Sequence, residues 1–354
     1  MTQSAPQIKN LTLKILLPVL IGIAVVALLF YDEFSISSWQ HIHFGLHTAI
    51  GIAIALFFVA GRDFGLTWRF HTIASPDISW RRALRVDLMC AFTSAITPSV
   101  VGGSAFAIFY LNREGVDVGR ATTLTLTTLF LDELFFVVFC PIILMLMPLG
   151  SLFGGTGSTV LDGIEVVFWL VYAGIVVWTT ILFLGIIVMP HAVQRILTHL
   201  FSVRILRRWL PAIESTTANM VATSAWVRSC SAGWWIRVFS ATVVSWFSRY
   251  LIVNAIFWAF VPDASQLLVF CRQFVVWVVL MVSPTPGGSG LSEWIFTEYY
   301  GDIIGSGDLA VVMALIWRLI TYYLYLLIGV VLIPGYFKKK KTDVSLPSDT
   351  GVSH

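Results

Sequence analysis

Long apolar stretches separated by short polar segments make up most of this chain. Several of them approach or exceed the roughly 20 residues that an α-helix needs to cross the hydrocarbon core of a bilayer. They predict six membrane-spanning helices: Leu16–Phe30, Phe44–Ala60, Ala121–Leu149, Ile164–Pro190, Trp235–Val261 and Leu309–Ile333. No small-x-small cleavage site follows the first stretch, so we interpret it as a retained helix rather than a secretory signal.

Two further apolar segments, 87–111 and 265–300, are interrupted near their middle. The first contains the break Thr97–Ser104 and the second the break Ser283–Ser289, each with proline and a glycine pair. Proline removes a backbone donor and ends a helix, while paired glycines permit a sharp turn. Each segment is therefore predicted to be two short helices joined by a turn.

Composition supports a membrane protein. The chain is 58% hydrophobic and 12% charged, with a mean hydropathy of +0.87, which leaves too little polar surface for a soluble domain. The four cysteines are far apart and have neither disulfide nor zinc spacing, so we interpret them as small buried hydrophobic residues. The predicted fold class is an all-α polytopic membrane protein.

Basic side chains lie in one set of linkers and are absent from the other. The basic set comprises Lys9, Lys14, Arg62, Arg69, Arg81, Arg82, Arg85, Arg113, Arg120, Arg195, Arg204, Arg207, Arg208, Arg228 and Lys338 to Lys341. The linkers 31–43, 150–163, 262–264 and 299–308 contain no Lys or Arg. By the positive-inside rule, the first set is cytoplasmic and the second external. We expect a multi-pass protein of the bacterial inner (plasma) membrane with both termini in the cytoplasm.

This charge pattern also constrains the two broken segments. If 87–111 crossed the membrane, the basic region 191–234 would lie outside. We therefore expect 87–111 to enter and leave on the cytoplasmic side and 265–300 on the external side. The prediction is six full spans plus two opposing re-entrant hairpins, about eight hydrophobic segments in all.

The same order of elements occurs twice, which predicts an inverted repeat. The expected single membrane domain, 15–337, contains repeat one (15–149) and repeat two (164–337). Corresponding broken helices in inverted repeats point to a transporter's central site. Alternatively, such prolines and glycines only permit kinks and close packing.

Outside the repeats we expect a cytoplasmic N-terminus over 1–14 and a disordered cytoplasmic tail over 338–354. Region 191–234 carries arginines beside Leu, Ile and Trp. It is predicted to be amphipathic and to lie on the anionic cytoplasmic leaflet.

Ionisable residues at bilayer depth are costly and tend to be functional. The predicted set is Arg249, Arg272, Arg318, Asp132, Glu133 and Glu293. Asp132 and Glu133 are adjacent, so they point about 100° apart on a helix, and the sequence leaves open which one faces a cavity. The set forms either structural ion pairs or an anion site in which the acids bind a cationic headgroup or a coupling proton.

Two familiar motifs fail on inspection. Gly287–Gly290 fits the G-x-S-G of intramembrane rhomboid proteases, but after His199 the only histidine is His354 in the polar tail. His41, His43 and His47 cluster, but no carboxylate or cysteine completes a convincing metal set. We expect no metal, no cofactor, no catalytic residue and no nucleic-acid partner.

With these residues in hand, the chain resembles the lysylphosphatidylglycerol synthase transmembrane-region family, also called flippase-like or UPF0104 proteins. The resemblance rests on Thr97–Phe106 leading to Tyr110–Val116, on Pro284–Glu293, and on Arg318 followed by Tyr322, Tyr323 and Gly329. Two departures stand out: Ser104, where many members have Gln, and Leu131-Asp132-Glu133, where many have Arg.

The resemblance implies a translocator, not an enzyme, that moves an anionic, aminoacylated or polyprenyl-phosphate lipid between leaflets. The expected substrate-binding residues are Pro98, Gly102, Gly103, Ser104, Tyr110, Pro286, Gly287, Gly288, Ser289, Arg249, Arg272 and Arg318. Asp132, Glu133 and Glu293 are expected to couple protons or bind the headgroup. The alternatives are an intramembrane lipid-modifying enzyme and a non-catalytic membrane partner of a separate lipid synthase.

Overall fold

The computed structural model describes residues 45–97, 102–154, 159–202 and 207–338. The predicted span 16–30, Pro98 and the tail beyond residue 338 lie outside these ranges. Within them the regular secondary structure is helical and no strand is present, which confirms the predicted all-α class.

Long helices form the body of the molecule. They are α3 (Leu46–Ala74), α6 (Val118–Leu146), α8 (Thr159–Phe183) with the π-helical turn η1 (Leu184–Val188), α11 (Ala232–Phe260), and α14 (Gly307–Arg318), η3 (Leu319–Tyr323) and α15 (Leu324–Lys338) in succession. Among the described residues, five such stretches are long and apolar enough to cross a membrane. They coincide with the five spans predicted after the first.

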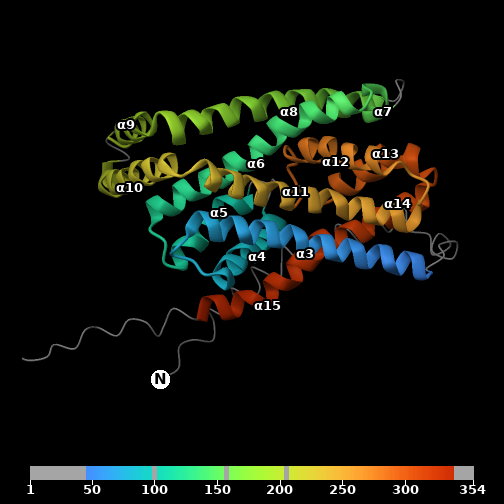
Figure 1. Cartoon of the computed structure of the whole chain (residues 1–354), viewed down its shortest axis with the longest axis horizontal. Helices are drawn as coiled ribbons and strands as arrows, with labels where there is room; N and C mark the ends of the chain where they lie inside the picture. The colour runs from blue at the N-terminus through green and yellow to red at the C-terminus, as the bar shows by residue number, and fades with distance from the viewer. Residues whose placement is uncertain (1–44, 98–101, 155–158, 203–206, 339–354) are drawn as a thin grey trace, which may run out of the picture.

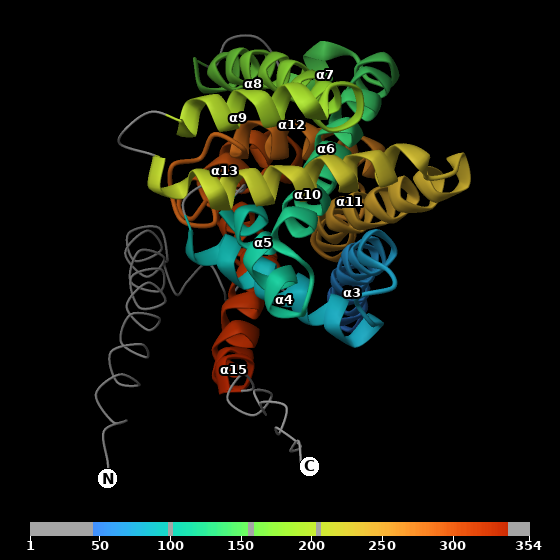
Figure 2. The ribbon, with the colours of Figure 1, turned by 90° about the vertical axis from the view of Figure 1, so that its left-hand side faces the viewer.

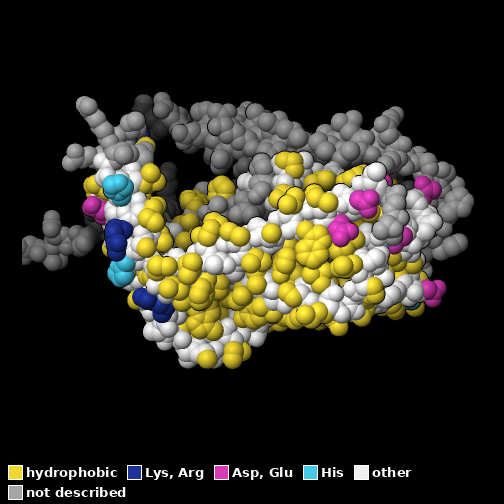
Figure 3. Space-filling model, turned by 90° about the horizontal axis from the view of Figure 1, so that it is seen from above, with side chains coloured by type: hydrophobic (Ala, Val, Ile, Leu, Met, Phe, Trp, Pro, Cys, Tyr) yellow, Lys and Arg dark blue, Asp and Glu magenta, His cyan; other side chains and the backbone are white. Residues whose placement is uncertain are grey.

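A wide hydrophobic band covers the face of the molecule seen in Figure 3. Arginine and histidine side chains mark the end where α9 and α10 lie, and acidic side chains mark the opposite end. Such a band between two charged ends is the surface expected of a chain whose helices cross a bilayer.

Two pairs of shorter helices correspond to the broken segments. They are α4 (Trp80–Ile96) with α5 (Gly102–Arg113), and α12 (Gln266–Leu280) with α13 (Leu291–Ile304). Each pair returns to the end of the molecule from which it starts. Arg85, near the start of α4, donates to Glu114 after α5 at 3.0 Å. Arg272 of α12 donates to Asp302 of α13. These pairs are therefore helical hairpins; their depth in a membrane stays a prediction.

The remaining helices are α7 (Leu149–Phe153), α9 (Pro190–Phe201), η2 (Arg207–Trp209) and α10 (Leu210–Ser229). Region 191–234, predicted as one amphipathic segment, is thus divided between two main helices. Helix α10 packs on α6: Asn219 donates to Asp117 at 3.0 Å, and Thr123 to the Met220 carbonyl at 3.5 Å. Part of this region is therefore buried against the helical body.

Helix α3 is longer than the predicted span 44–60. We assigned Arg62 and Arg69 to a cytoplasmic linker, and that assignment is wrong. The helix continues to Ala74, and both arginines are buried within it. Their burial is compensated by acidic partners, which the hydropathy pattern does not show.

Helices α3 and α11 pack antiparallel along their length (Figure 2). Glycines of α3 allow this approach: a Cβ at Gly65 would lie 2.7 Å from the backbone nitrogen of Ser245, and one at Gly51 would press on Ala259. Small residues at such an interface let two backbones come close. The order long helix, hairpin, long helix thus occurs on each side of this contact, as α3, α4–α5, α6 and as α11, α12–α13, α14–α15.

Candidate functional site

The breaks of the two hairpins meet inside the molecule. The backbone N–H of Gly287 donates to the Thr97 carbonyl at 3.2 Å, although the residues are far apart in the sequence. Tyr322, from the π-helical turn η3, donates to the Ala95 carbonyl at 3.2 Å. Gly287 has φ +56° and no room for a Cβ beside the Tyr322 ring, so only glycine fits there without strain. The two tips and η3 therefore form one packed junction.

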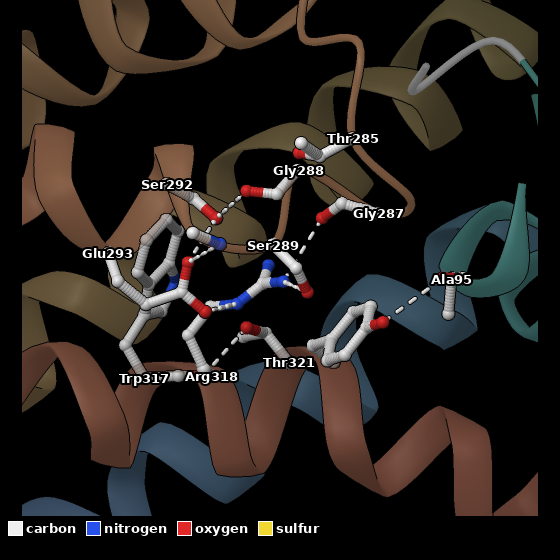
Figure 4. A network of polar contacts seen from close by, with 12 residues as sticks. Ala95, Thr285, Gly287, Gly288, Ser289, Ser292, Glu293, Trp317, Arg318 and Thr321 are labelled. Atoms are coloured by element: carbon white, nitrogen blue, oxygen red, sulfur yellow. Dashed lines mark hydrogen bonds and ion pairs between the residues drawn. The ribbon is translucent and has the colours of Figure 1, made fainter. Parts of the chain in front are cut away.

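A buried ion pair fixes the second tip (Figure 4). The Nε of Arg318 donates to Oε1 of Glu293 at 2.8 Å, and both side chains are more than nine-tenths buried. The other carboxylate oxygen accepts from the Gly290 N–H at 2.8 Å and from the Ser292 hydroxyl at 3.1 Å. Glu293 thus caps the start of α13 and neutralises an arginine from α14.

Arg318 also holds the glycine turn directly. Its Nη2 donates to the Gly287 carbonyl at 3.1 Å and to the Ser289 hydroxyl at 3.3 Å. The guanidinium lies 4.1 Å from the centre of the Tyr322 ring, within cation–π range. The helix changes from α to π geometry directly after Arg318. Single π-helical turns inside α-helices occur frequently at functional sites.

A cavity of about 210 Å³ lies beside this junction. Its wall includes side chains from α3, α4, α6, α11, α12 and the α14–α15 segment. The glycines Gly103, Gly287 and Gly288 line it. So do seven Arg, Asp and Glu residues: Arg62, Arg69, Arg249, Arg318, Asp87, Asp132 and Glu133. The cavity is thus a charged chamber inside an apolar helical body.

Two of the cavity arginines have acidic partners on the first half of the chain. Arg69 donates to both carboxylate oxygens of Asp132, at 2.6 and 3.0 Å, and Trp246 donates to the same carboxylate at 2.8 Å. Arg62 lies 3.5 Å from Asp63, whose oxygens also accept from the Tyr325 hydroxyl. The Arg69–Asp132 pair ties α3 to α6, and the Tyr325–Asp63 hydrogen bonds tie α15 to α3.

Arg249 is different. Its guanidinium lies between the rings of Trp246 and Trp277, 4.5 and 4.7 Å from their centres. No carboxylate among the described residues lies within ion-pair distance of it, and its Nε has no hydrogen-bond partner there. Aromatic faces stabilise a guanidinium without neutralising its charge. Arg249 therefore presents to the cavity a positive charge that no carboxylate of the described residues contacts directly.

Two carboxyl groups lining the cavity likewise have no basic partner among the described residues. Asp87 of α4 is buried and accepts one long hydrogen bond, from Thr67 at 3.4 Å. Glu133 of α6 is buried, and its Oε2 has no hydrogen-bond partner. Asp132 and Glu133 both line the cavity, which answers the question left open by the sequence: one is ion-paired and the other is not.

Two predicted site residues lie elsewhere. Arg272 was expected to neutralise a substrate phosphate, yet it is absent from the cavity wall. It pairs with Asp302 and donates to the carbonyls of Ser151 and Tyr299, so it joins α7 to the second hairpin. Tyr110 lies in α5 and shares a 2.6 Å hydrogen bond with Thr93, which ties the two legs of the first hairpin together.

The other predicted residues lie at the tips or outside the described residues. Pro286 closes the second turn by accepting from the Ser289 N–H at 3.0 Å. Gly102 begins α5. Pro98 and the side chain of Ser104 lie outside the described residues, as do His41 and His43. The ring of His47 lies 3.9 Å from that of Trp258.

Sequence reasoning missed Arg62, Asp63, Arg69 and Asp87. A signal was present in the sequence: Arg62 and Arg69 are seven residues apart, so they occupy one face of a helix. This spacing was overlooked because Arg62 and Arg69 were both assigned to a linker.

Comparisons with known proteins agree with this architecture. A family model described as "Lysylphosphatidylglycerol synthase TM region" matches residues 15–329. A curated UPF0104 membrane protein from Archaeoglobus fulgidus is 26% identical over 325 residues, covering 88% of this chain and 94% of that protein. No solved structure matches the chain. Membrane residence and a multi-pass arrangement are thereby supported; the bacterial inner membrane and the orientation of the termini stay predictions.

Proposed function

The chain belongs to the lysylphosphatidylglycerol synthase transmembrane-region family, and we propose that it translocates a phosphate-bearing lipid between the leaflets of the membrane. One observation carries the proposal: Arg249 presents a positive charge, without an acidic partner among the described residues, to a chamber beside the meeting point of two helix breaks.

A phosphate suits this arginine on chemical grounds. The planar guanidinium donates two parallel hydrogen bonds to a phosphate or carboxylate, and such charge-assisted bonds are about twice as strong as neutral ones. Trp246 and Trp277 hold the group in place, so less side-chain freedom is lost on binding. An anion entering the chamber neutralises a charge that the described residues leave unmatched.

The carboxyl groups without a basic partner allow the chamber to accept more than one class of lipid headgroup. Asp87 and Glu133 line the same chamber as Arg249. A cationic group on an aminoacylated lipid pairs with either acid while the phosphate binds Arg249; with a purely anionic or polyprenyl-phosphate lipid, the acids take up protons instead. Buried charges are stable only when paired or neutralised, so both arrangements satisfy the chamber.

The proposed movement uses the two hairpins. Their tips touch through the Gly287–Thr97 backbone bond, and Tyr322 of η3 adds a hydrogen bond to the Ala95 carbonyl at the end of α4. Hydrogen bonds of this kind are individually weak. The α3–α11 contact, in contrast, runs along both helices. We propose that one hairpin-bearing half moves against the other about α3–α11, so that the chamber opens to each leaflet in turn. This use of an inverted repeat is part of the proposal.

In this proposal the protein moves the lipid between leaflets without altering it chemically. We further propose that a separate lipid synthase, acting on the membrane surface, supplies the lipid. Co-purification with such an enzyme, together with movement of its product by the isolated chain, supports this arrangement. Lipid turnover by the purified protein contradicts the proposal and favours a lipid-modifying enzyme.

The test is lipid movement by purified protein in vesicles that carry a fluorescent phospholipid, read by chemical quenching of the outer leaflet. Arg249→Gln removes the unmatched charge and is expected to abolish most of the protein-dependent movement. Arg237→Gln is the matched control, because Arg237 lies on the same helix and is exposed. Wild-type protein that moves no phosphate-bearing lipid, or equal rates for the wild type and Arg249→Gln, refutes the proposal.

A further inference from the structure

A second cavity, also of about 210 Å³, lies away from the charged chamber. Helices α6, α8, α9 and α10 and the π-helical turn η1 enclose it, at the end of the molecule that carries the exposed arginines and histidines (Figures 1 and 3). It shares no lining residue with the first cavity. The proposed transport mechanism does not use it.

The wall of this cavity is almost entirely apolar. Leu126 of α6, Leu182 and Ile186 of the α8–η1 segment, and Met220 of α10 line it. The lining also includes Thr123, Gln194, Thr217 and Ser224, and the hydroxyls of Thr123 and Thr217 donate to backbone carbonyls of their own helices. An apolar cavity of about 150 Å³ stays dry and takes up a small hydrocarbon. The present cavity is larger, and its lining offers a water molecule few polar partners.

Exposed side chains of a candidate membrane span form one side of the cavity. Trp178 and Ile181 line it, and both belong to the candidate span 159–188, with 46% and 53% of their surfaces exposed. Exposed apolar side chains on such a helix face lipid tails. Gly185, in the π-helical turn, leaves space beside them, since a Cβ there would meet only Val193, at 3.3 Å.

Exposed arginines lie on α9 and α10, which line the cavity, and on the adjoining turn η2. Gln194 lines the cavity, and the next residue, Arg195, is exposed. Arg208 and Arg228, at the two ends of the η2–α10 segment, are exposed too. Basic side chains near a membrane span attract anionic headgroups.

We infer that this cavity binds one acyl chain of an anionic phospholipid from the surrounding bilayer, with the phosphate of that lipid held by the exposed Arg195 of α9 and Arg208 of η2. The acyl chain fills a cavity whose lining side chains would otherwise lack dispersion contacts on that side. The headgroup supplies the charge that the arginines attract. This lipid is a resident ligand, and its binding does not depend on lipid translocation.

Photocrosslinking tests the inference with full-length protein in vesicles. The probe is phosphatidylglycerol with a diazirine in one acyl chain, and the reference is phosphatidylcholine with the same chain. Irradiation followed by peptide mapping is expected to place the label on the inward-facing Leu126, Ile186 and Met220. Labelling by the phosphatidylglycerol probe should exceed labelling by the phosphatidylcholine probe. In the double variant Arg195→Gln/Arg208→Gln, labelling by phosphatidylglycerol should fall to the level seen with phosphatidylcholine.

Filling the cavity provides the matched comparison. Gly185→Leu places an isobutyl group in the cavity, and Ser224→Leu does so from α10, should the first variant fold poorly. Gly174→Leu is the control, because it lies on α8 with open space around it. Loss of inner labelling in a folded cavity-filling variant but not in the control supports the site. Label confined to outward residues such as Leu170 and Val177, or inner labelling that survives filling, overturns it.

Discussion

The Glu293–Arg318 pair allows a quantitative test of how the second hairpin is held. Both side chains are more than nine-tenths buried, and Nε and Oε1 are 2.8 Å apart. Glu293→Gln removes the negative charge but keeps the size and an acceptor for the Gly290 N–H. The perturbation therefore isolates one effect: Arg318 stays buried without a counter-ion.

The expected loss of stability is large because both members of the ion pair are shielded from water. Removing one partner of a buried ion pair typically costs about 3–5 kcal/mol, since the remaining charge is neither hydrated nor matched. Arg318 keeps its bonds to the Gly287 carbonyl and the Ser289 hydroxyl, so the lower end of that range applies. We expect Glu293→Gln to lower the free energy of unfolding by about 3 kcal/mol.

Unfolding in mixed micelles of a nonionic detergent and increasing dodecyl sulfate, followed by tryptophan fluorescence, measures this loss. Arg82→Gln is the comparison: Arg82 is half-exposed, lies 3.7 Å from Glu114, and should cost at most about 1 kcal/mol. In a double-mutant cycle, Glu293→Gln and Arg318→Met together should cost less than the sum of the single changes. A Glu293→Gln loss below that of Arg82→Gln, or simple additivity, would refute the reasoning.

Three further predictions test the remaining contacts. Asp132→Asn leaves Arg69 without its anion and should destabilise the protein in the same unfolding assay, but less than Glu293→Gln does, since Asp132 is 22% exposed. Gly287→Ala forces an L side chain to φ +56° against the Tyr322 ring and should cost about 1–3 kcal/mol or more, whereas Gly301→Ala, with open space around it, should be tolerated. Cysteines placed at Arg81 and Asn112, in a variant lacking the native cysteines, should react with an impermeant thiol reagent from the same side of the membrane. Labelling from opposite sides would show that the α4–α5 segment crosses the membrane once and is not a hairpin.

Most of the architecture could be read from the chain without its structure. Apolar length marked the five described spans, because the bilayer sets the number of residues that a helix needs to cross it. Proline and paired glycine marked both breaks, because local backbone chemistry alone ends a helix there. Position within the predicted membrane segments also singled out six ionisable residues as candidates for a common site. Arg249, Arg318, Asp132 and Glu133 line the chamber, whereas Arg272 and Glu293 do not.

Tertiary contacts decided which charges are matched, and that information is not local. Arg272 resembles Arg318 in sequence context, yet Asp302 and the Ser151 carbonyl of α7 engage it away from the chamber. Arg62 and Arg69 resemble linker charges, yet α3 continues past them and acidic side chains compensate their burial. The partnerless state of Arg249 follows from two tryptophans on different helices. Sequence determines where a chain turns and which segments are apolar; only packing determines which buried charge is left for a ligand.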